Sequence, residues 1–139
     1  MASVSGIWTS PGKRELMEPR EAVSAVAGHG LEGCAHARPG SGRQVLFASV
    51  DHLRAVGVEP GTIKENFTVE GADVQTWAVG QRLRAGNAVF EITMECEPCE
   101  LMDAIRPGLQ AELEGRRGML ARVIETGAVS IGDELRLLS

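Results

Sequence analysis

Short apolar runs recur along this chain, and many of them alternate with polar residues. Glycine, proline or asparagine separates the runs, which is the pattern of strands and tight turns rather than of long helices. The strands predicted from these runs cover residues 4–9, 22–27, 44–48, 65–69, 79–84, 88–93, 118–124 and 129–137. We therefore predict a mainly β fold, a closed or nearly closed barrel with a few short helices.

Two of the predicted turns indicate hairpins. The turn at 85–87 joins the strands 79–84 and 88–93, and its glycine and asparagine suit a tight antiparallel connection. The turn at 126–127 is expected to join the last two strands into a final hairpin in the same way.

Three segments interrupt this strand pattern. Ser49 is expected to cap a short helix over 51–56, and residues 103–114 form the main helical stretch with an interruption at 107–108. Residues 28–42 contain five glycines and a proline, which predicts a long loop. Long loops within compact domains often carry function.

Composition narrows the class of protein. A length of 139 residues suits a single domain over 1–139, and a hydrophobic content of 43% is enough for a core. The net charge of -5 argues against a nucleic-acid partner, because phosphate neutralisation needs clustered Lys and Arg. No apolar run approaches the ~20 residues that cross a bilayer, so no membrane association is expected. Three cysteines and no recognisable secretory signal fit a reducing cytoplasm, which we expect as the location.

Cys99 is the most informative position for chemistry. A strand-like segment ends at Pro98 and a helix-like segment begins, so the Cys99 thiol is expected near a helix N-terminus, where the thiolate is favoured. Thiolates bind soft metals and carry sulfur. The alternative is a buried cysteine that acts as a small hydrophobe. Cys96 belongs to the apolar side of the strand pattern, so Cys99 is expected to be the more reactive thiol.

The spacing of Cys96 and Cys99 has three interpretations. A thioredoxin-like redox pair requires a βαβ setting, which the pattern of this chain does not suggest. A structural zinc site requires a second pair of ligands, and the spacing of Cys34 and His36 is unusual for one. We favour the third interpretation, one functional thiol with an incidental neighbour.

Three further positions are candidates for ligand binding. His36 lies in the glycine-rich loop and is either a structural hydrogen-bonding group or a pocket residue that a ligand approaches closely. Asn66 either fixes a turn or bonds a ligand through its amide. Arg116 and Arg117 either interact favourably with the negative C-terminal end of a helix dipole or bind phosphate or carboxylate through bidentate contacts.

Several segments, taken together and in order, resemble the MOSC domain family, which is named for the C-terminal part of molybdenum cofactor sulfurases. They are 33–36, 42–45, 64–71, 79–84, 98–99, 115–122 and 131–133. The resemblance extends from about Gly6 to Leu137, and the chain is similar to a small, stand-alone member of the family.

This resemblance implies a MOSC-like β-barrel and molybdenum cofactor (molybdopterin) as ligand. The family's characteristic cysteine, thought to hold sulfur or to ligate molybdenum, falls on Cys99, and its basic and amide groups fall on Arg43, Asn66, Arg116 and Arg117. A pterin cofactor bears a phosphate, which arginine side chains suit. In one departure from the family, Cys34 stands where many relatives have an aspartate. Either the activity has been changed or lost, or Cys34 adds a second thiol near Cys99.

The resemblance suggests two functions, one enzymatic and one not, and the sequence does not decide between them. The first is a small molybdenum-cofactor-binding oxidoreductase acting on N-oxygenated compounds, with Cys99 as the metal thiolate ligand and a partner protein as electron donor. There, Arg43, Arg116 and Arg117 hold the cofactor phosphate, while His36 and Asn66 line the pocket. The second is a non-catalytic sulfur carrier or cofactor-delivery module that works with a sulfurase.

A ligand-binding barrel unrelated to molybdenum, in which Cys99 is merely buried, is the remaining alternative. The two molybdenum functions make a common geometrical prediction. Cys99, His36, Asn66 and the pair Arg116 and Arg117 should converge on one concave pocket, although they lie far apart in the sequence.

Overall fold

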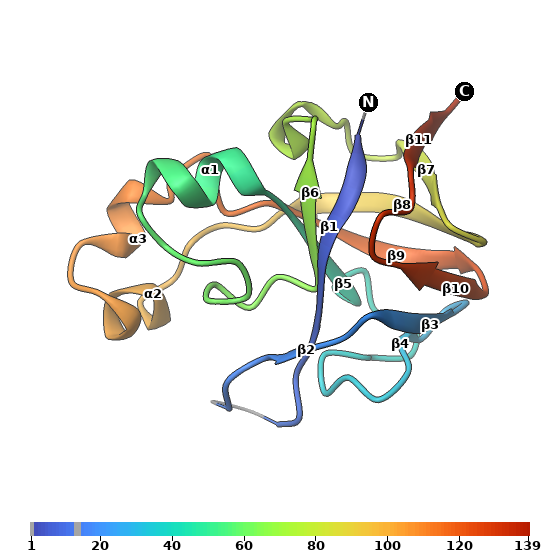
Figure 1. Cartoon of the computed structure of the whole chain (residues 1–139), viewed down its shortest axis with the longest axis horizontal. Helices are drawn as coiled ribbons and strands as arrows, with labels where there is room; N and C mark the ends of the chain where they lie inside the picture. The colour runs from blue at the N-terminus through green and yellow to red at the C-terminus, as the bar shows by residue number, and fades with distance from the viewer. Residues whose placement is uncertain (1, 13–14) are drawn as a thin grey trace.

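The computed structural model describes residues 2–12 and 15–139 and shows a mainly β protein with its helices gathered at one end (Figure 1). The strands are β1 (Ser3–Thr9), β2 (Glu18–Pro19), β3 (Ala22–Val26), β4 (Gly30–Leu31), β5 (Val45–Ser49), β6 (Phe67–Glu70), β7 (Arg82–Ala85), β8 (Ala88–Glu95), β9 (Met119–Glu125), β10 (Gly127–Ser130) and β11 (Leu135–Leu138). The helices are α1 (Val50–Ala55), α2 (Leu101–Ile105), α3 (Leu109–Glu112) and the 3-10 turn η1 (Val74–Thr76). Within the two described ranges, no helix has the length and apolarity needed to span a membrane.

Two sheets make up the fold. One has eight strands in the order β11-β7-β8-β9-β5-β6-β1-β2, and the other has three in the order β10-β3-β4. The pair β5 and β6 is parallel, with Phe47 opposite Phe67, and the other strand pairs are antiparallel. A parallel pair requires a crossover, which α1 and the loop after it provide. This crossover later supplies part of the candidate site.

The predicted mainly β class is confirmed, but a closed barrel is not. Among the described residues, β1 meets the segment before β11 at the single bridge Ser3–Glu134, supported by a hydrogen bond from the Leu135 N–H to the Ala2 carbonyl (2.9 Å). A continuous ladder does not form, because part of the same edge of β1 pairs with β2 at Trp8. The sheet is therefore curved and nearly meets itself without closing.

The predicted final hairpin is wrong. After β9 the chain leaves the large sheet, so that β10 pairs with β3 and β11 pairs with β7. Gly127 permits this path, because a Cβ atom there would lie 2.3 Å from the Asn87 carbonyl carbon. Only a glycine lets the backbone pass the turn between β7 and β8 so closely. The hairpin of β7 and β8 itself is confirmed.

The helical predictions are partly confirmed. A helix follows Ser49, but the Ser49 hydroxyl donates to the Ala72 carbonyl and accepts from the Val74 N–H (both 2.9 Å) instead of capping α1. The second helical stretch is interrupted where it was predicted to be, which separates α2 from α3. The Ser49 side chain therefore fastens η1 to the end of β5.

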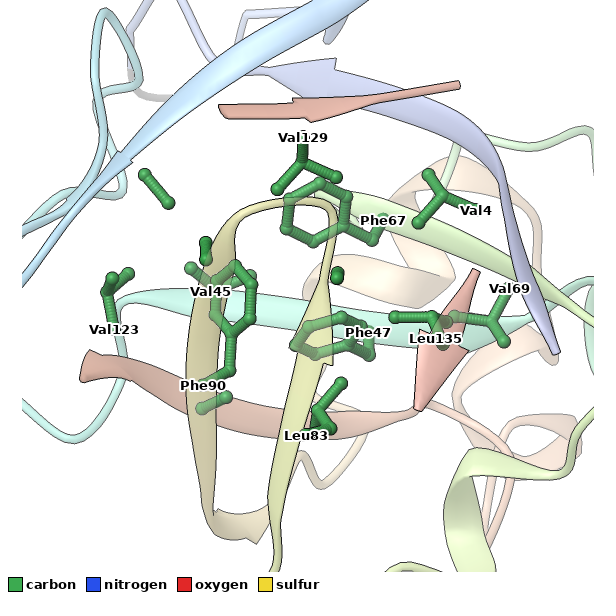
Figure 2. Packing of buried hydrophobic residues seen from close by; sticks show 14 of the residues in the cluster. Val4, Val45, Phe47, Phe67, Val69, Leu83, Phe90, Val123, Val129 and Leu135 are labelled. Carbon is green, nitrogen blue, oxygen red and sulfur yellow. The ribbon is translucent and has the colours of Figure 1, made fainter. Parts of the chain in front are cut away.

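The main core lies between the two sheets. Figure 2 shows Phe47, Phe67 and Phe90 grouped at its centre, with ring centroids 5.1 to 5.6 Å apart. Such aromatic pairs stabilise a core beyond the area that they bury. A second cluster packs the three helices onto the end of β5 and contains Ala48, Leu53, Val56, Ile63, Met102, Leu109 and Leu113. All five residues of β5 are buried, so this strand is a rigid wall for whatever lies beside it.

Candidate functional site

A cavity of about 490 Å³ lies beside β5, larger than the hollow of about 330 Å³ next to β3 and the one of about 240 Å³ next to β7 and β11. Its walls come from the loop after β4, from β5 and the crossover before β6, and from segments next to β8, α2 and β9. The lining residues are His36, Arg38, Arg43, Gln44, Val45, Leu46, Lys64, Asn66, Cys96, Leu101, Arg117 and Leu120. Four sequence-predicted site residues, His36, Arg43, Asn66 and Arg117, are therefore brought together here.

The charge of the lining is one-sided. It includes four cationic side chains and an imidazole but no aspartate or glutamate, in a chain whose net charge is -5. Clustered cations without compensating carboxylates create a positive potential that attracts anions. The cavity is therefore built for a negatively charged ligand.

Arg117 is the buried cation of this group. It is 8% exposed, and its Nη2 donates to the Ile63 carbonyl (2.9 Å). Its Nε–H is buried and has no hydrogen-bond partner among the described residues. A buried, unpaired guanidinium N–H is costly unless a further acceptor satisfies it. This orphan donor is the clearest local sign of a missing anionic partner.

Glu65 lies near Arg117 but does not neutralise it by direct contact. The Glu65 Oε2 atom accepts from the Gly61 N–H and the Thr68 hydroxyl (both 2.8 Å), while Oε1 has no partner in the described structure. Burial raises the pKa of the Glu65 carboxyl, and the hydrogen bonds and the charge of Arg117 offset this only in part. Glu65 therefore holds the turn 61–65 in shape rather than serving the cavity as a full negative charge.

Asn66 is used mainly within the protein. It is fully buried, its Oδ1 accepts from the Leu46 N–H (3.0 Å), and its Nδ2 donates to the Trp8 carbonyl (3.1 Å) and to the Cys34 sulfur (3.4 Å). Of the two roles considered from the sequence, these contacts support fixing the backbone. Asn66 thereby ties β1, β5 and the start of β6 together at the cavity wall.

Cys34 lies directly behind this wall. Its sulfur also accepts from the Ser10 N–H (3.3 Å), and the residue is 7% exposed. Burial alone raises the pKa of a thiol, but hydrogen bonds from the His36 side chain, the Ser10 N–H and the His36 N–H lower the pKa of Cys34 below its ordinary value overall. The Cys34 sulfur therefore accepts hydrogen bonds directly behind a lining residue.

The two cysteines of the C-x-x-C spacing have different environments. Cys96 is 4% exposed and lines the cavity, and burial raises the pKa of its thiol more than the charges of Arg117 and Arg43 lower it. Cys99 is exposed and does not itself line the cavity. It lies on the loop that joins two lining residues, Cys96 and Leu101.

The remaining predicted residues are placed as follows. His36 is half-buried at the cavity, and Arg43 is exposed with its Nη1 3.8 Å from the Met94 sulfur. Arg116 is half-buried, donates its N–H to the Leu113 carbonyl (2.8 Å) and is outside the lining. The structure therefore divides the pair, and only Arg117 lines the cavity.

Sequence reasoning did not select Arg38, Lys64 or Gln44 as site residues. Arg38 is close in sequence to His36 and Arg43, which was an available signal. Gln44 is buried and bonds both the Arg38 carbonyl (3.2 Å) and the Val123 N–H (3.0 Å), so it anchors the glycine-rich loop. No local pattern marks a buried glutamine for this role.

Across residues 2–12 and 15–139, no group of three or more His, Cys, Asp or Glu side chains is placed to hold a metal ion. The described structure thus gives no support to the structural zinc interpretation of the cysteine spacing.

Comparison with solved structures finds proteins of the same fold. The YuaD protein from Bacillus subtilis is similar at 19% identity and a TM-score of 0.83, with 99% of this chain and 96% of that chain covered. YiiM from Geobacillus stearothermophilus is similar at 18% identity and a TM-score of 0.79, with 100% and 76% covered. YiiM from Escherichia coli gives 19% identity and a TM-score of 0.73, with 99% and 70% covered. A comparison with curated protein sequences gives no match.

Fold and site together define a small β protein with a cationic, thiol-bearing cavity. The sequence model of the MOSC domain matches residues 36–136, a span that contains every lining residue of the cavity. The chain belongs to the MOSC domain family, which is associated with molybdenum cofactor binding.

The lining fits such a ligand. The orphan N–H of Arg117 and the other cations suit the phosphate of a pterin cofactor, and a thiol in the wall suits a soft metal. We therefore treat the cavity as compatible with the family's cofactor.

Proposed function

We propose that the cavity binds molybdenum cofactor and that the protein is a small oxidoreductase that reduces N-oxygenated compounds. The observation that supports cofactor binding is the lining of the cavity, with five basic side chains, no carboxylate and the unpaired buried N–H of Arg117. The reaction and its substrate class are inferred by analogy with the family. Arginine donors arranged in this way suit the phosphate of the cofactor, which they bind through charge-assisted hydrogen bonds.

Specific roles follow from the positions of the side chains. Arg117, Arg43 and Arg38 hold the phosphate, and Arg116 is left out of this set because it does not line the cavity. The backbone turn that carries Asn66 and the anchored loop that carries His36 shape the wall. When bound, the cofactor supplies a metal centre that exchanges electrons with the substrate.

Cys99 is proposed as the thiolate ligand of the metal. Its thiol is exposed on a loop between two lining residues, so it is open to an incoming metal. Cys96 is the alternative ligand because it lines the cavity, although burial raises the pKa of its thiol and so disfavours the thiolate that a metal requires.

The proposed reaction has a simple balance. Reduction of an N–OH group to N–H consumes two electrons and two protons and releases one water molecule. The electrons come from a partner protein in this proposal. His36 is the one imidazole of the cavity lining, and we assign it the delivery of a proton.

A second function has one observation in its favour. The exposure of Cys99 leaves its sulfur accessible to another protein, as a carrier of persulfide sulfur requires. In this alternative a sulfurase loads Cys99, or the protein delivers the cofactor, without turnover.

Molybdenum analysis separates these functions. Protein purified from a host that makes the cofactor should contain stoichiometric molybdenum, and Arg117→Gln should lower the molybdenum content by about tenfold. Arg122→Gln is a matched control, because Arg122 is exposed, pairs with Glu91 and lies outside the cavity. Labile sulfur without molybdenum would favour the carrier.

The ligand assignment is tested with two single variants. Cys99→Ser should lose molybdenum, whereas Cys96→Ser should keep most of it. The reverse result would move the metal ligand to Cys96. Retention of molybdenum by both variants and by Arg117→Gln would reject the proposed site.

A further inference from the structure

Lys64 has a backbone conformation that a lysine does not favour. Its φ is +70°, in the left-handed region, and it is the one non-glycine residue with a positive φ among the described residues. Thirteen glycines occupy the other positive-φ positions of the described chain. A side chain other than glycine carries an energetic cost in this conformation. At every comparable position, therefore, the chain uses the residue that avoids this cost.

The surrounding contacts hold the turn that contains Lys64. The Lys64 N–H donates to the Gly61 carbonyl (3.3 Å), which closes a turn. The side chains of the next two residues are also fixed. The Glu65 carboxylate accepts a hydrogen bond from the Gly61 N–H, and the Asn66 Oδ1 accepts one from the Leu46 N–H. A conformation that the neighbouring structure imposes in this way is retained at a functional site more often than elsewhere.

The side chain gives a reason for keeping a lysine there. Lys64 lines the cavity, where the three arginines and His36 are the other basic groups and no carboxylate is present. The Lys64 ammonium also donates to the main-chain carbonyl of exposed Glu15. The carbonyl carries no net charge, so this hydrogen bond does not itself neutralise the ammonium, which still adds to the potential of the cavity.

We infer that Lys64 is a recognition residue for the phosphate of the bound ligand, retained at a strained position for its charge. This inference rests on the proposed function, because it concerns the same cavity. Its chemistry differs from that of the arginines. A lysine is a compact point charge rather than a planar fork, which suits the terminal oxygens of a tetrahedral phosphate monoester.

Substitution separates the conformation from the charge. Lys64→Gly removes both the strain and the charge, Lys64→Asn removes the charge and relieves part of the strain, and Lys64→Arg keeps both. Arg54→Gln is the control for net charge, because Arg54 is exposed on α1 and outside the cavity. Each variant is titrated with inorganic phosphate at constant ionic strength, followed by amide chemical shifts, and its thermal unfolding is measured without phosphate.

Lys64→Gly should raise Tm by about 4 °C while weakening phosphate binding by about tenfold. Lys64→Asn should weaken binding equally with a smaller rise in Tm. Lys64→Arg and Arg54→Gln should stay within about twofold of the original affinity. Gain of stability with loss of binding is the signature of a residue kept for function.

Three results would overturn the inference. They are unchanged phosphate affinity in Lys64→Gly, a fall in its Tm, and no phosphate binding by the unmodified protein. The proposed function fails separately. Lys64-dependent phosphate binding in a protein that never acquires molybdenum would remove the proposed cofactor and leave this inference standing. If the protein acquires molybdenum but its Lys64→Gly variant binds phosphate normally, the proposed cofactor stands and the inference about Lys64 fails.

Discussion

Replacing Arg117 with methionine tests whether the buried guanidinium serves the ligand or the fold. A structural arginine in a complete buried network costs about 3–5 kcal/mol when it is broken. Among the described residues, the Arg117 side chain makes one hydrogen bond, from Nη2 to the Ile63 carbonyl, whose loss costs about 1.5–3 kcal/mol. The same substitution removes a buried charge with an unpaired N–H, and this removal stabilises the folded state by about 1–3 kcal/mol. We therefore expect Arg117→Met to lower the free energy of unfolding by no more than about 1–2 kcal/mol.

Urea unfolding gives this free energy, and the slope of the transition shows whether the folded state stays equally compact. Phosphate titration of the same samples should show binding at least about tenfold weaker. Arg122→Met is the control, because its exposed ion pair with Glu91 contributes at most about 1 kcal/mol. A loss of more than about 3 kcal/mol with unchanged phosphate binding would show that Arg117 is a structural residue and refute the reasoning.

Three other predictions concern the neighbouring residues. Gly118→Ala should destabilise the protein by at least about 3 kcal/mol in thermal unfolding, because its φ is +118° and a Cβ there would lie 2.1 Å from the Phe47 carbonyl oxygen; a small change in Tm would contradict this. Because the folded protein lowers the pKa of Cys34, this thiol adds stability that is fully present above pH 9.0 and is lost as pH falls through the folded-state pKa. Cys34→Ser should therefore abolish this part of the pH dependence of urea unfolding. An unchanged pH dependence would argue against a lowered pKa of Cys34. Mass spectrometry should show faster alkylation of exposed Cys99 than of buried Cys96, and the opposite order would count against Cys99 as the metal ligand.

Local patterns were enough to predict most of the secondary structure. Alternation predicts β1, β3 and β8, and glycine next to asparagine predicts the hairpin of β7 and β8. The partners of β10 and β11 were not predictable, because both pair with strands far away in the sequence. The path that separates them depends on how closely Gly127 passes Asn87, which no local pattern encodes.

The candidate site was predictable to a similar extent. Composition and family motifs pointed to His36, Arg43 and Arg117, which do meet at the cavity. The difference between Arg116 and Arg117 depends on which adjacent side chain turns inward as the chain enters β9. The strain at Lys64 was hidden for a related reason, since φ is imposed by contacts of residues 61–66 with other parts of the chain.

The bridge between Ser3 and Glu134 means that the order of the strands along the chain could be changed without changing the fold. It holds the beginning of β1 beside the beginning of β11, so Ala2 and Leu135 lie side by side close to the two ends of the chain (Figure 1). Every lining residue of the cavity falls between 36 and 120. Connecting the termini with a short linker and reopening the chain at the exposed turn after α1 would therefore give a circular permutant with the same contacts. In that permutant, β11 and β1 become neighbours in sequence, whereas the parallel pairing of β5 and β6 becomes the most distant strand pairing and the expected slow step of folding.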